Sequence, residues 1–271
     1  MTGTRPARRV RVDVLLVERG LAPTREKAQA LLLAGLVTSD GVRLDKPGRL
    51  IASDLSLEVA EGRRFVGRGA EKLGPALTHF AITVAGRDAI DIGASTGGFT
   101  QVLLEAGAAR VIALDVGRGQ LDWSLRNDPR VVPHEGVNVR FLDPDTLPFR
   151  PSLATIDVSF ISLRQVLEPA CACLAPGADV VALVKPQFEV GRGLVGKGGI
   201  VRDPAQWDRV LAELVEFAVS RRLGPARLAR SALPGASGNV EFFLHLRPAA
   251  EPSAMSALQA ERQEAVHAAV R

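Results

Sequence analysis

From residue 86 onward, the chain alternates short apolar runs with segments of helical character. The strand-like runs are DAIDIG (88–93), RVIALDV (110–116), RVVP (130–133), LATIDVSF (153–160) and DVVALVKP (179–186). The segments 97–107, 162–173 and 204–222 have the length and apolar spacing of helices. Strands that alternate with helices predict an α/β fold, in which a mostly parallel sheet is covered on both faces.

The last two strand-like runs depart from this alternation. ARLARSAL (226–233) and VEFFLHLR (240–247) are separated only by a short loop that contains Pro and Gly. Because such a loop cannot hold a crossover helix, we expect these two strands to pair antiparallel. A parallel sheet closed by one antiparallel C-terminal hairpin is typical of Rossmann-like methyltransferases that use S-adenosylmethionine (SAM). A further helix is expected from about Ser256.

The loop DIGASTGG (91–98) lies between the first of these strands and a helix. It is not the usual dinucleotide motif, because Ser95 stands where that motif has its second glycine, and no Gly-Lys-Ser/Thr follows. Glycines here let the backbone approach a ligand, and the start of the helix offers free N–H groups. Asp115 ends the next strand, where an acidic side chain can meet ribose hydroxyls. We therefore predict a SAM site, with Asp91, Gly93, Gly97, Gly98 and Asp115 among its binding residues.

The N-terminal quarter of the chain has a different pattern and carries the excess positive charge. Two short helices are predicted over 10–20 and 24–35, followed by a hairpin at Asp40-Gly41 and a strand near 55–59. Residues 1–72 carry 14 Lys and Arg against 9 Asp and Glu, whereas residues 73–271 carry 20 against 21. This distribution predicts a small α+β module that binds a polyanion. The expected domains are 1–62 and 69–271, joined by a linker over 63–68.

Composition narrows the class of protein further. The chain has 271 residues, of which 46% are hydrophobic and 24% charged, as in a soluble globular protein. No apolar run approaches the roughly 18 residues that a membrane span needs, and no signal peptide is recognisable. Cys171 and Cys173 lie two apart, so they cannot form a CxxC redox pair, and we expect buried thiols. We predict a cytoplasmic protein without a metal site.

Four charged residues are predicted to lie at strand ends or helix starts of the α/β unit: Lys72, Asp157, Lys185 and Glu241. Asp157 and Lys185 follow apolar strands at their carboxyl ends, where open α/β sheets bind ligands. Charged residues within apolar strands are seldom buried unless they are paired or functional. Each residue alone fits a structural ion pair, but the four together predict a site.

Several of these runs together resemble the TlyA family: SxGGFT, ALDVGRGQLDWSLRNDPRV, DVSFISL, LVKPQFEVGRG and GNVEFFLHL. The N-terminal run RVDVLLVERGLAPTREKAQALLLAGLVTSDG is similar to the S4 RNA-binding domain of that family. The resemblance covers about residues 8–247. It implies an FtsJ-like catalytic domain that methylates ribose 2′-hydroxyls of ribosomal RNA (rRNA) with SAM. It also implies that Lys72, Asp157, Lys185 and Glu241 form the catalytic set. With the resemblance, Ser95, Phe99 and Asp157 join the residues expected to bind SAM.

The resemblance further implies a cytidine in the rRNA of the large subunit as the target. Longer members of the family also modify the rRNA of the small subunit. The basic N-terminal extension and the C-terminal helix of this chain are typical of longer members and favour modification of both subunits. We expect no membrane association and a monomer. The residues expected to contact RNA phosphates are Arg5, Arg8, Arg9, Arg11, Arg25, Lys27, Arg43, Lys46 and Arg49.

The role of Lys185 remains open at this stage. Attack by a ribose 2′-hydroxyl on a sulfonium methyl requires that the hydroxyl proton is lost or strongly polarised. As a base Lys185 must be neutral, whereas an ammonium would orient the hydroxyl and stabilise a developing alkoxide. Two other functions also compete with rRNA methylation. One is a secreted haemolysin, and the other is a ribosome-assembly factor that binds SAM without catalysis.

Overall fold

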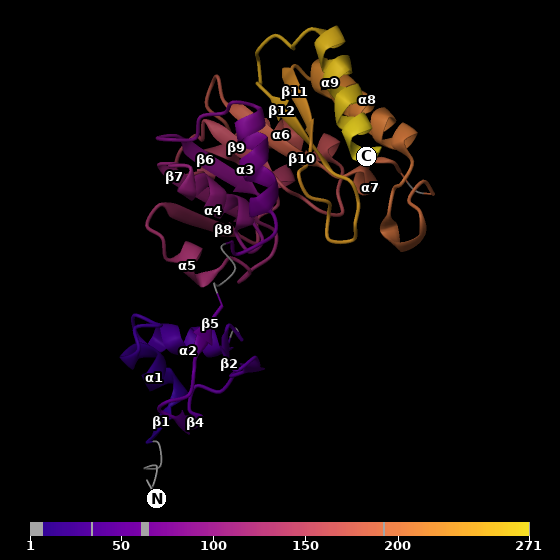
Figure 1. Ribbon diagram of the computed structural model, residues 1–271. Coiled ribbons are helices and arrows are strands. Elements are labelled where there is room, and N and C mark those ends of the chain that lie inside the picture. The colour runs from indigo at the N-terminus through magenta and orange to yellow at the C-terminus, as the bar shows by residue number, and fades with distance from the viewer. Residues whose placement is uncertain (1–7, 34, 61–64, 192, 271) are drawn as a thin grey trace, which may run out of the picture. The chain divides into compact units, whose positions relative to one another are not determined.

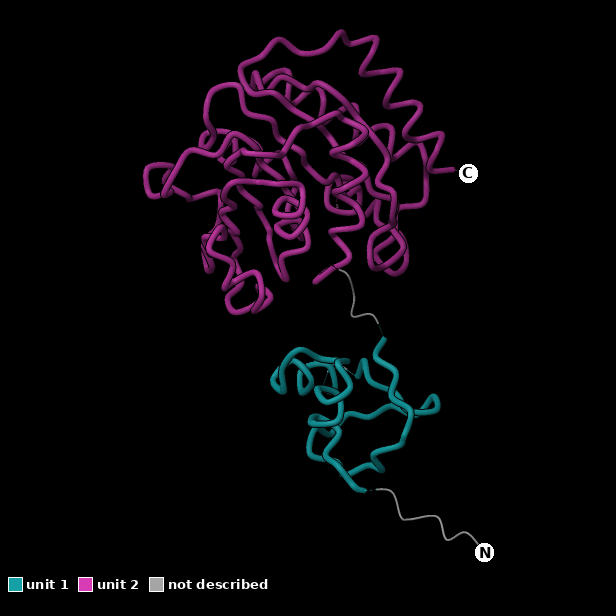
Figure 2. The backbone as a smooth tube through the Cα atoms, turned by 60° about the vertical axis from the view of Figure 1, so that its left-hand side comes forward, with its two compact units in different colours: residues 1–64 teal, residues 65–271 magenta. Residues whose placement is uncertain are grey.

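The computed structural model describes residues 8–33, 35–60, 65–191 and 193–270. The chain divides into two compact units, residues 1–64 and 65–271, which are coloured separately in Figure 2. Each unit has its own hydrophobic core, so we describe the two separately. The predicted linker over 63–68 stays a prediction, because residues 63 and 64 lie outside the described residues.

The N-terminal unit is a small α+β module. Its elements are β1 (Arg9–Arg11), α1 (Val12–Glu18), α2 (Arg25–Leu33), β2 (Val37–Ser39), β3 (Val42–Arg43), β4 (Leu50–Ala52) and β5 (Glu58–Val59). The hairpin between β2 and β3 turns at Asp40 and Gly41, which both have positive φ, as predicted for this dipeptide. Leu15 and Leu16 of α1 pack with Leu32 of α2 in the core of the module.

Two strands of this module were not predicted. Arg9–Arg11 pairs antiparallel with Leu50–Ala52, so the helix expected from residue 10 begins only at Val12. A three-residue strand is too short to show a hydrophobic period, and only its distant partner identifies it. The strand expected over 55–59 is also shorter than predicted and comprises Glu58–Val59.

The C-terminal unit is built on a seven-stranded sheet with the order β11-β12-β10-β9-β6-β7-β8. Its strands are β6 (Asp88–Ile92), β7 (Arg110–Asp115), β8 (Val131–Glu135), β9 (Leu153–Ile156), β10 (Asp179–Val184), β11 (Pro225–Arg230) and β12 (Phe242–Leu246). The neighbouring strands β8, β7, β6, β9 and β10, in this spatial order, are all parallel. Strand β12 runs antiparallel to both β10 and β11. The predicted α/β class, with one antiparallel C-terminal hairpin, is confirmed.

Helices cover both faces of this sheet (Figure 1). They are α3 (Ala70–His79), α4 (Gly98–Glu105), α5 (Trp123–Arg126), α6 (Leu167–Ala172), α7 (Pro186–Glu189), α8 (Pro204–Ser220) and α9 (Met255–Val270). Alternate strand residues face opposite layers. Ile90 packs in the core that holds α6 and α8 residues, whereas Ala89 packs in the core that holds α3 and α4 residues.

Several predicted elements differ from those of the structure. The strand expected over 153–160 ends at Ile156, and the helix expected over 162–173 is a short 3-10 turn, Leu163–Gln165, followed by α6. Helix α3 was not predicted, because Gly74 and Pro75 interrupt its sequence pattern. Cys173 is a buried free thiol, as predicted, whereas Cys171 is a free thiol that is only partly buried. Burial raises the pKa of Cys171 to about 12.

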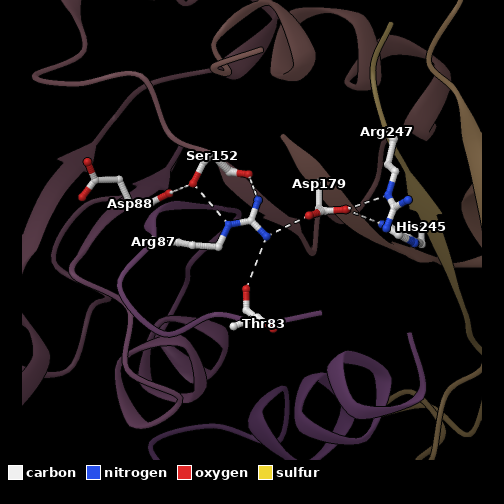
Figure 3. A network of polar contacts seen from close by, with 7 residues as sticks. All are labelled: Thr83, Arg87, Asp88, Ser152, Asp179, His245 and Arg247. Atoms are coloured by element: carbon white, nitrogen blue, oxygen red, sulfur yellow. Dashed lines mark hydrogen bonds and ion pairs between the residues drawn. The ribbon is translucent and has the colours of Figure 1, made fainter. Parts of the chain in front are cut away.

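A polar network fixes the amino-terminal edge of the sheet (Figure 3). Asp179, the first residue of β10, accepts hydrogen bonds from Arg87 Nη1 at 2.7 Å and Arg247 Nε at 3.2 Å. His245 Nε2 lies 2.8 Å from the same carboxylate, and Arg87 also bonds to Ser152. The network therefore ties β10 to β12 and to the segments that precede β6 and β9.

Candidate active site and cofactor cavity

The loop that follows β6 requires glycine at two positions and has a tight backbone contact at a third. Gly93 has φ +86, and a Cβ there would lie 2.3 Å from the carbonyl oxygen of Asp157. Gly97 has φ +98, and its Cβ would lie 2.2 Å from Cδ1 of Leu125. Gly98 begins α4, where a Cβ would lie 3.1 Å from the amide nitrogen of Ala70. The absence of a side chain at each glycine thus lets the neighbouring segments of the chain pack closely against this loop.

A cavity of about 590 Å³ opens beside this loop, at the carboxyl ends of the strands. Its size lies within the range typical of small-ligand sites. Gly93 and Ser95 line it, together with Asp115 from the end of β7 and Asp157 from the end of β9. Apolar walls come from Val116, Val137, Val139, Val158, Ile161 and Val166. A second, smaller cavity of about 130 Å³ is lined by Gly67, Gly69, Gly98, Phe99 and Asp157 among others.

Asp115 is held in place by backbone N–H groups. The Ser95 amide donates to Oδ2 at 2.7 Å, and the Gly117 amide donates to Oδ1 at 2.7 Å. Each carboxylate oxygen has further lone pairs, which can accept hydroxyl groups of a ligand in the cavity. Ser95 itself has φ +49, so the loop bends sharply at the point where its amide meets Asp115.

Asp91 lies apart from both cavities. It is fully buried and accepts hydrogen bonds from Thr100 Oγ1 at 2.7 Å and Thr155 Oγ1 at 3.2 Å. Burial, followed by the nearby charge of Asp157, raises the pKa of Asp91 to about 7. Phe99 is also buried and packs 6.2 Å from Phe243, although it touches the smaller cavity.

The four charged residues expected to form one site lie in two ion pairs. Lys72 Nζ is 2.6 Å from Glu241 Oε2, and both side chains are almost entirely buried. Lys185 Nζ is 2.6 Å from Asp157 Oδ1, and these side chains are 12% and 23% exposed. Only the second pair is partly open to solvent, and its Asp157 lines both cavities.

The sheet explains why these residues meet. Asp157 follows the last residue of β9 and Lys185 follows the last residue of β10, and these strands are parallel neighbours. Glu241 precedes β12, whose first residue Phe242 pairs with Val184, so the antiparallel register brings Glu241 beside Lys185. Lys72 reaches the same edge from the first turn of α3.

Three residues at this edge were not predicted. Ser159 Oγ accepts a hydrogen bond from Lys185 Nζ at 2.9 Å and lines the large cavity. Phe160 also lines the cavity, has φ +64 and is 92% exposed, although a bulky residue rarely adopts such a φ. Glu189 of α7 accepts hydrogen bonds from Ser162 Oγ at 2.6 Å and Leu163 N at 2.7 Å. It thereby ties the segment after Phe160 to the segment after Lys185.

The basic residues expected to bind RNA lie in the N-terminal unit. Arg5 is outside the described residues. The other eight have exposed side chains: Arg8, Arg9, Arg11, Arg25, Lys27, Arg43, Lys46 and Arg49. Two of them, Arg11 and Arg25, form ion pairs with buried Asp13. In the described ranges, no helix is long and apolar enough to cross a membrane, and no group of His, Cys, Asp or Glu is arranged to hold a metal.

Comparison with known proteins agrees with this architecture. The FtsJ-like methyltransferase family matches residues 65–248, and the S4 domain family matches residues 10–54. A relative from Mycobacterium tuberculosis H37Rv, named 16S/23S rRNA (cytidine-2′-O)-methyltransferase TlyA, is 50% identical over 97% of this chain and 98% of its own length. Hemolysin A of Brachyspira hyodysenteriae is 38% identical over 87% of this chain and 99% of its own.

A solved structure from Streptococcus thermophilus, described as a hemolysin, matches with a TM-score of 0.73 and 43% identity. The match covers 98% of this chain and 97% of the other. The similarity to the solved structure and to the M. tuberculosis relative therefore includes both units of the chain. The chain therefore belongs to the TlyA family, which joins an S4 domain to an FtsJ-like methyltransferase domain.

Proposed function

We propose that this protein transfers a methyl group from SAM to the 2′-hydroxyl of a cytidine ribose in rRNA. The position of Asp157 carries this proposal. Asp157 lines the large cavity, and its Oδ1 lies 2.6 Å from Lys185 Nζ, so the candidate cofactor site and the ion pair of Lys185 share this residue. A group bound in the cavity would therefore lie within reach of Lys185.

The cavity fits SAM in its chemistry. Asp115 can accept two ribose hydroxyls, and the backbone around Gly93 and Ser95 allows close approach. The apolar walls from Val116, Val139 and other residues suit an adenine ring. When bound, SAM supplies an electrophilic methyl group on a sulfonium.

Lys185 is the residue that we propose acts on the RNA hydroxyl. Its amino group has contacts with Asp157 and Ser159, which fix the direction of the side chain. A lysine head carries up to three N–H donors, so one can still face a ribose oxygen. From this position Lys185 orients the hydroxyl and stabilises negative charge that develops on its oxygen.

The buried pair of Lys72 and Glu241 has a positioning role in this proposal. Its charges offset each other at 2.6 Å, so Glu241 can lie beside Lys185 without an uncompensated buried carboxylate. Substitution of either partner would leave the other charge buried and alone. We therefore expect Lys72 and Glu241 to support the geometry of Lys185 and Asp157.

The N-terminal unit supplies the contacts with RNA. Eight exposed cationic side chains there can bind phosphates, which position a substrate without reading its sequence. The name of the M. tuberculosis relative includes both 16S and 23S rRNA. We propose the large subunit as a substrate of this chain, and the small subunit as a second one, so the protein would act where ribosomes are, in the cytoplasm.

The test is to incubate the full chain with each ribosomal subunit and methyl-labelled SAM, and then to map 2′-O-methyl groups on the rRNA. We expect label at a cytidine ribose, and we expect Asp115→Ala to weaken SAM binding in calorimetry. If SAM binds but no label is transferred, a non-catalytic assembly factor fits better. If the chain lyses erythrocytes and neither binds SAM nor methylates RNA, the haemolysin function replaces this proposal.

A further inference from the structure

Glu189 is the last residue of α7, and its carboxylate caps the 3-10 turn Leu163–Gln165. Oε1 accepts a hydrogen bond from the amide of Leu163 at 2.7 Å, and Oε2 accepts one from the hydroxyl of Ser162 at 2.6 Å. The Ser162 hydroxyl oxygen in turn accepts from the amide of Arg164 at 3.2 Å. These two side chains thus satisfy the first two amides of the turn, which have no partner within it.

Neutral donors hold this carboxylate in place. Burial raises the pKa of Glu189, and the hydrogen bonds from Ser162 and Leu163 oppose this effect. The nearby Arg164 donates instead to Glu213, at 2.7 Å, and among the described residues no cation forms an ion pair with Glu189. A half-buried carboxylate is costly unless its hydrogen bonds are satisfied, so the contacts with the turn are what stabilise it here.

The segment that ends at this cap forms one wall of the large cavity. Residues 157–161 all line the cavity. Lys185 holds the start of the segment, because its Nζ lies 2.6 Å from Asp157 Oδ1 and 2.9 Å from Ser159 Oγ. Glu189 holds the end of the segment. Lys185 and Glu189 are four residues apart, about one helical turn, so one short element supplies both anchors.

Phe160 lies between the two anchored parts of the segment. Its φ of +64 is a backbone conformation that a bulky residue keeps only where the surrounding contacts enforce it. The ring of Phe160 lies 5.2 Å from that of Phe188, which itself precedes Glu189 in α7. The anchors on both sides of Phe160 therefore account for its strained conformation.

We propose that Glu189 is a positioning residue for methyl transfer, which fixes residues 157–162 so that Asp157 and Ser159 aim Lys185 at the RNA hydroxyl. This inference rests on the proposed function. Without the cap, the segment is anchored at one end only, and Lys185 loses the fixed direction of its side chain. A small misplacement of a reacting group lowers the rate strongly. SAM binding should suffer less, because the cavity walls from β6 and β7 stay in place.

The test compares Glu189→Ala with Glu189→Gln in the full chain, by steady-state methylation of rRNA and by SAM calorimetry. Glutamine keeps an oxygen that can accept from the Leu163 amide and adds an amide that can donate to the Ser162 hydroxyl, whereas alanine removes both contacts. We expect Glu189→Ala to lower kcat about tenfold or more, with a smaller loss of SAM affinity. We expect Glu189→Gln to keep kcat within about threefold of the unmodified protein. A loss of kcat in Glu189→Gln as large as in Glu189→Ala would overturn the inference.

Asp143→Ala is the matched control. Asp143 also caps a 3-10 turn, Pro144–Thr146, by accepting from the Asp145 amide at 3.0 Å, but it lines neither cavity. Loss of a cap destabilises the fold, so both alanine variants should unfold at a lower temperature than the unmodified protein. Only Glu189→Ala should lose kcat. Equal kcat in the two alanine variants would show that Glu189 has a structural role alone.

Ser162→Ala keeps the inference testable if Glu189→Ala fails to fold. This variant removes one of the two hydrogen bonds to Glu189 and leaves the one from Leu163. We expect a smaller loss of kcat than in Glu189→Ala, and an unchanged kcat would overturn the inference. Absence of methyl transfer by the unmodified chain would contradict the proposed function itself.

Discussion

At the scale of single residues, Phe160 is the most exposed aromatic side chain near the candidate site. It is 92% exposed, lines the cavity and lies 5.2 Å from the ring of Phe188. Its positive φ places a bulky residue in a strained backbone region, and such strain is often retained at functional sites. We infer that the ring stacks on a base of the RNA near the target ribose.

Substitution of Phe160 by alanine tests this inference. Base–aromatic stacking contributes about 1–3 kcal/mol, so Phe160→Ala should lower kcat/KM for rRNA by roughly tenfold or more. Phe160→Trp should restore most of the loss because it keeps a stacking face, and SAM affinity should fall less than kcat/KM does, although Phe160 also lines the cavity. Steady-state methylation and SAM calorimetry provide the two measurements. Normal kcat/KM in the alanine variant would exclude stacking.

Asp91 gives a second prediction at this scale, which concerns pH. Its pKa rises from 3.8 to about 7 on folding, so the folded chain binds a proton that the unfolded chain has released. The resulting stabilisation is complete below pH 3.8 and is lost as the pH rises through about 7. Asp91→Asn removes this dependence and should raise the free energy of unfolding above pH 7 by roughly 2–4 kcal/mol. Urea unfolding at several pH values measures the free energy of unfolding of both proteins. The same pH dependence in Asp91→Asn and the unmodified protein would contradict the prediction.

At the scale of elements, the two edges of the sheet have different tasks. The carboxyl edge holds the cavity and the charged residues, whereas the amino edge is closed by the network around Asp179 (Figure 3). Burial raises the pKa of Asp179, but hydrogen bonds from His245 and Arg87 outweigh this effect and lower it below its usual value. The network should therefore contribute to stability but not to catalysis.

Asp179→Asn tests this division of tasks. Loss of the charge leaves Arg87 and Arg247 without a counterion, so the free energy of unfolding should fall by roughly 2–4 kcal/mol. Because the folded pKa is lowered, the stabilisation is present above the unfolded pKa and is lost as the pH falls. Denaturant unfolding and SAM calorimetry on the same samples check both parts. A large change in SAM affinity without a change in stability would argue against the division.

The elements also show what the sequence could predict. Asp115 and Lys185 were correctly predicted at strand ends, because each one follows a run of apolar residues and a buried strand ends where polar residues begin. The contacts of Glu189 with Ser162 and of Asp13 with Arg25 were not predictable, since the pairing of residues far apart in sequence depends on tertiary packing. Helix α3 was missed because Gly74 and Pro75 oppose local helix propensity, which packing overrides.

At the scale of the whole molecule, we propose that the N-terminal unit binds RNA and the C-terminal unit transfers the methyl group. Arg8 and Arg9 are exposed in the N-terminal unit and contact neither cavity. The double variant Arg8→Glu and Arg9→Glu should weaken RNA binding at least tenfold, with a shallower salt dependence, and leave SAM affinity unchanged. Filter binding and calorimetry measure the two affinities. If RNA affinity is unchanged, these side chains form only a solvated face.

The most direct test of the account is a comparison of methyl transfer and SAM binding for Lys185→Ala. Lys185 is proposed to act on the RNA hydroxyl and to lie beside, not within, the wall of the large cavity. We expect SAM affinity within about twofold of the unmodified protein and a loss of methyl transfer of about a hundredfold or more. Near-normal turnover in Lys185→Ala would contradict the assignment of this site.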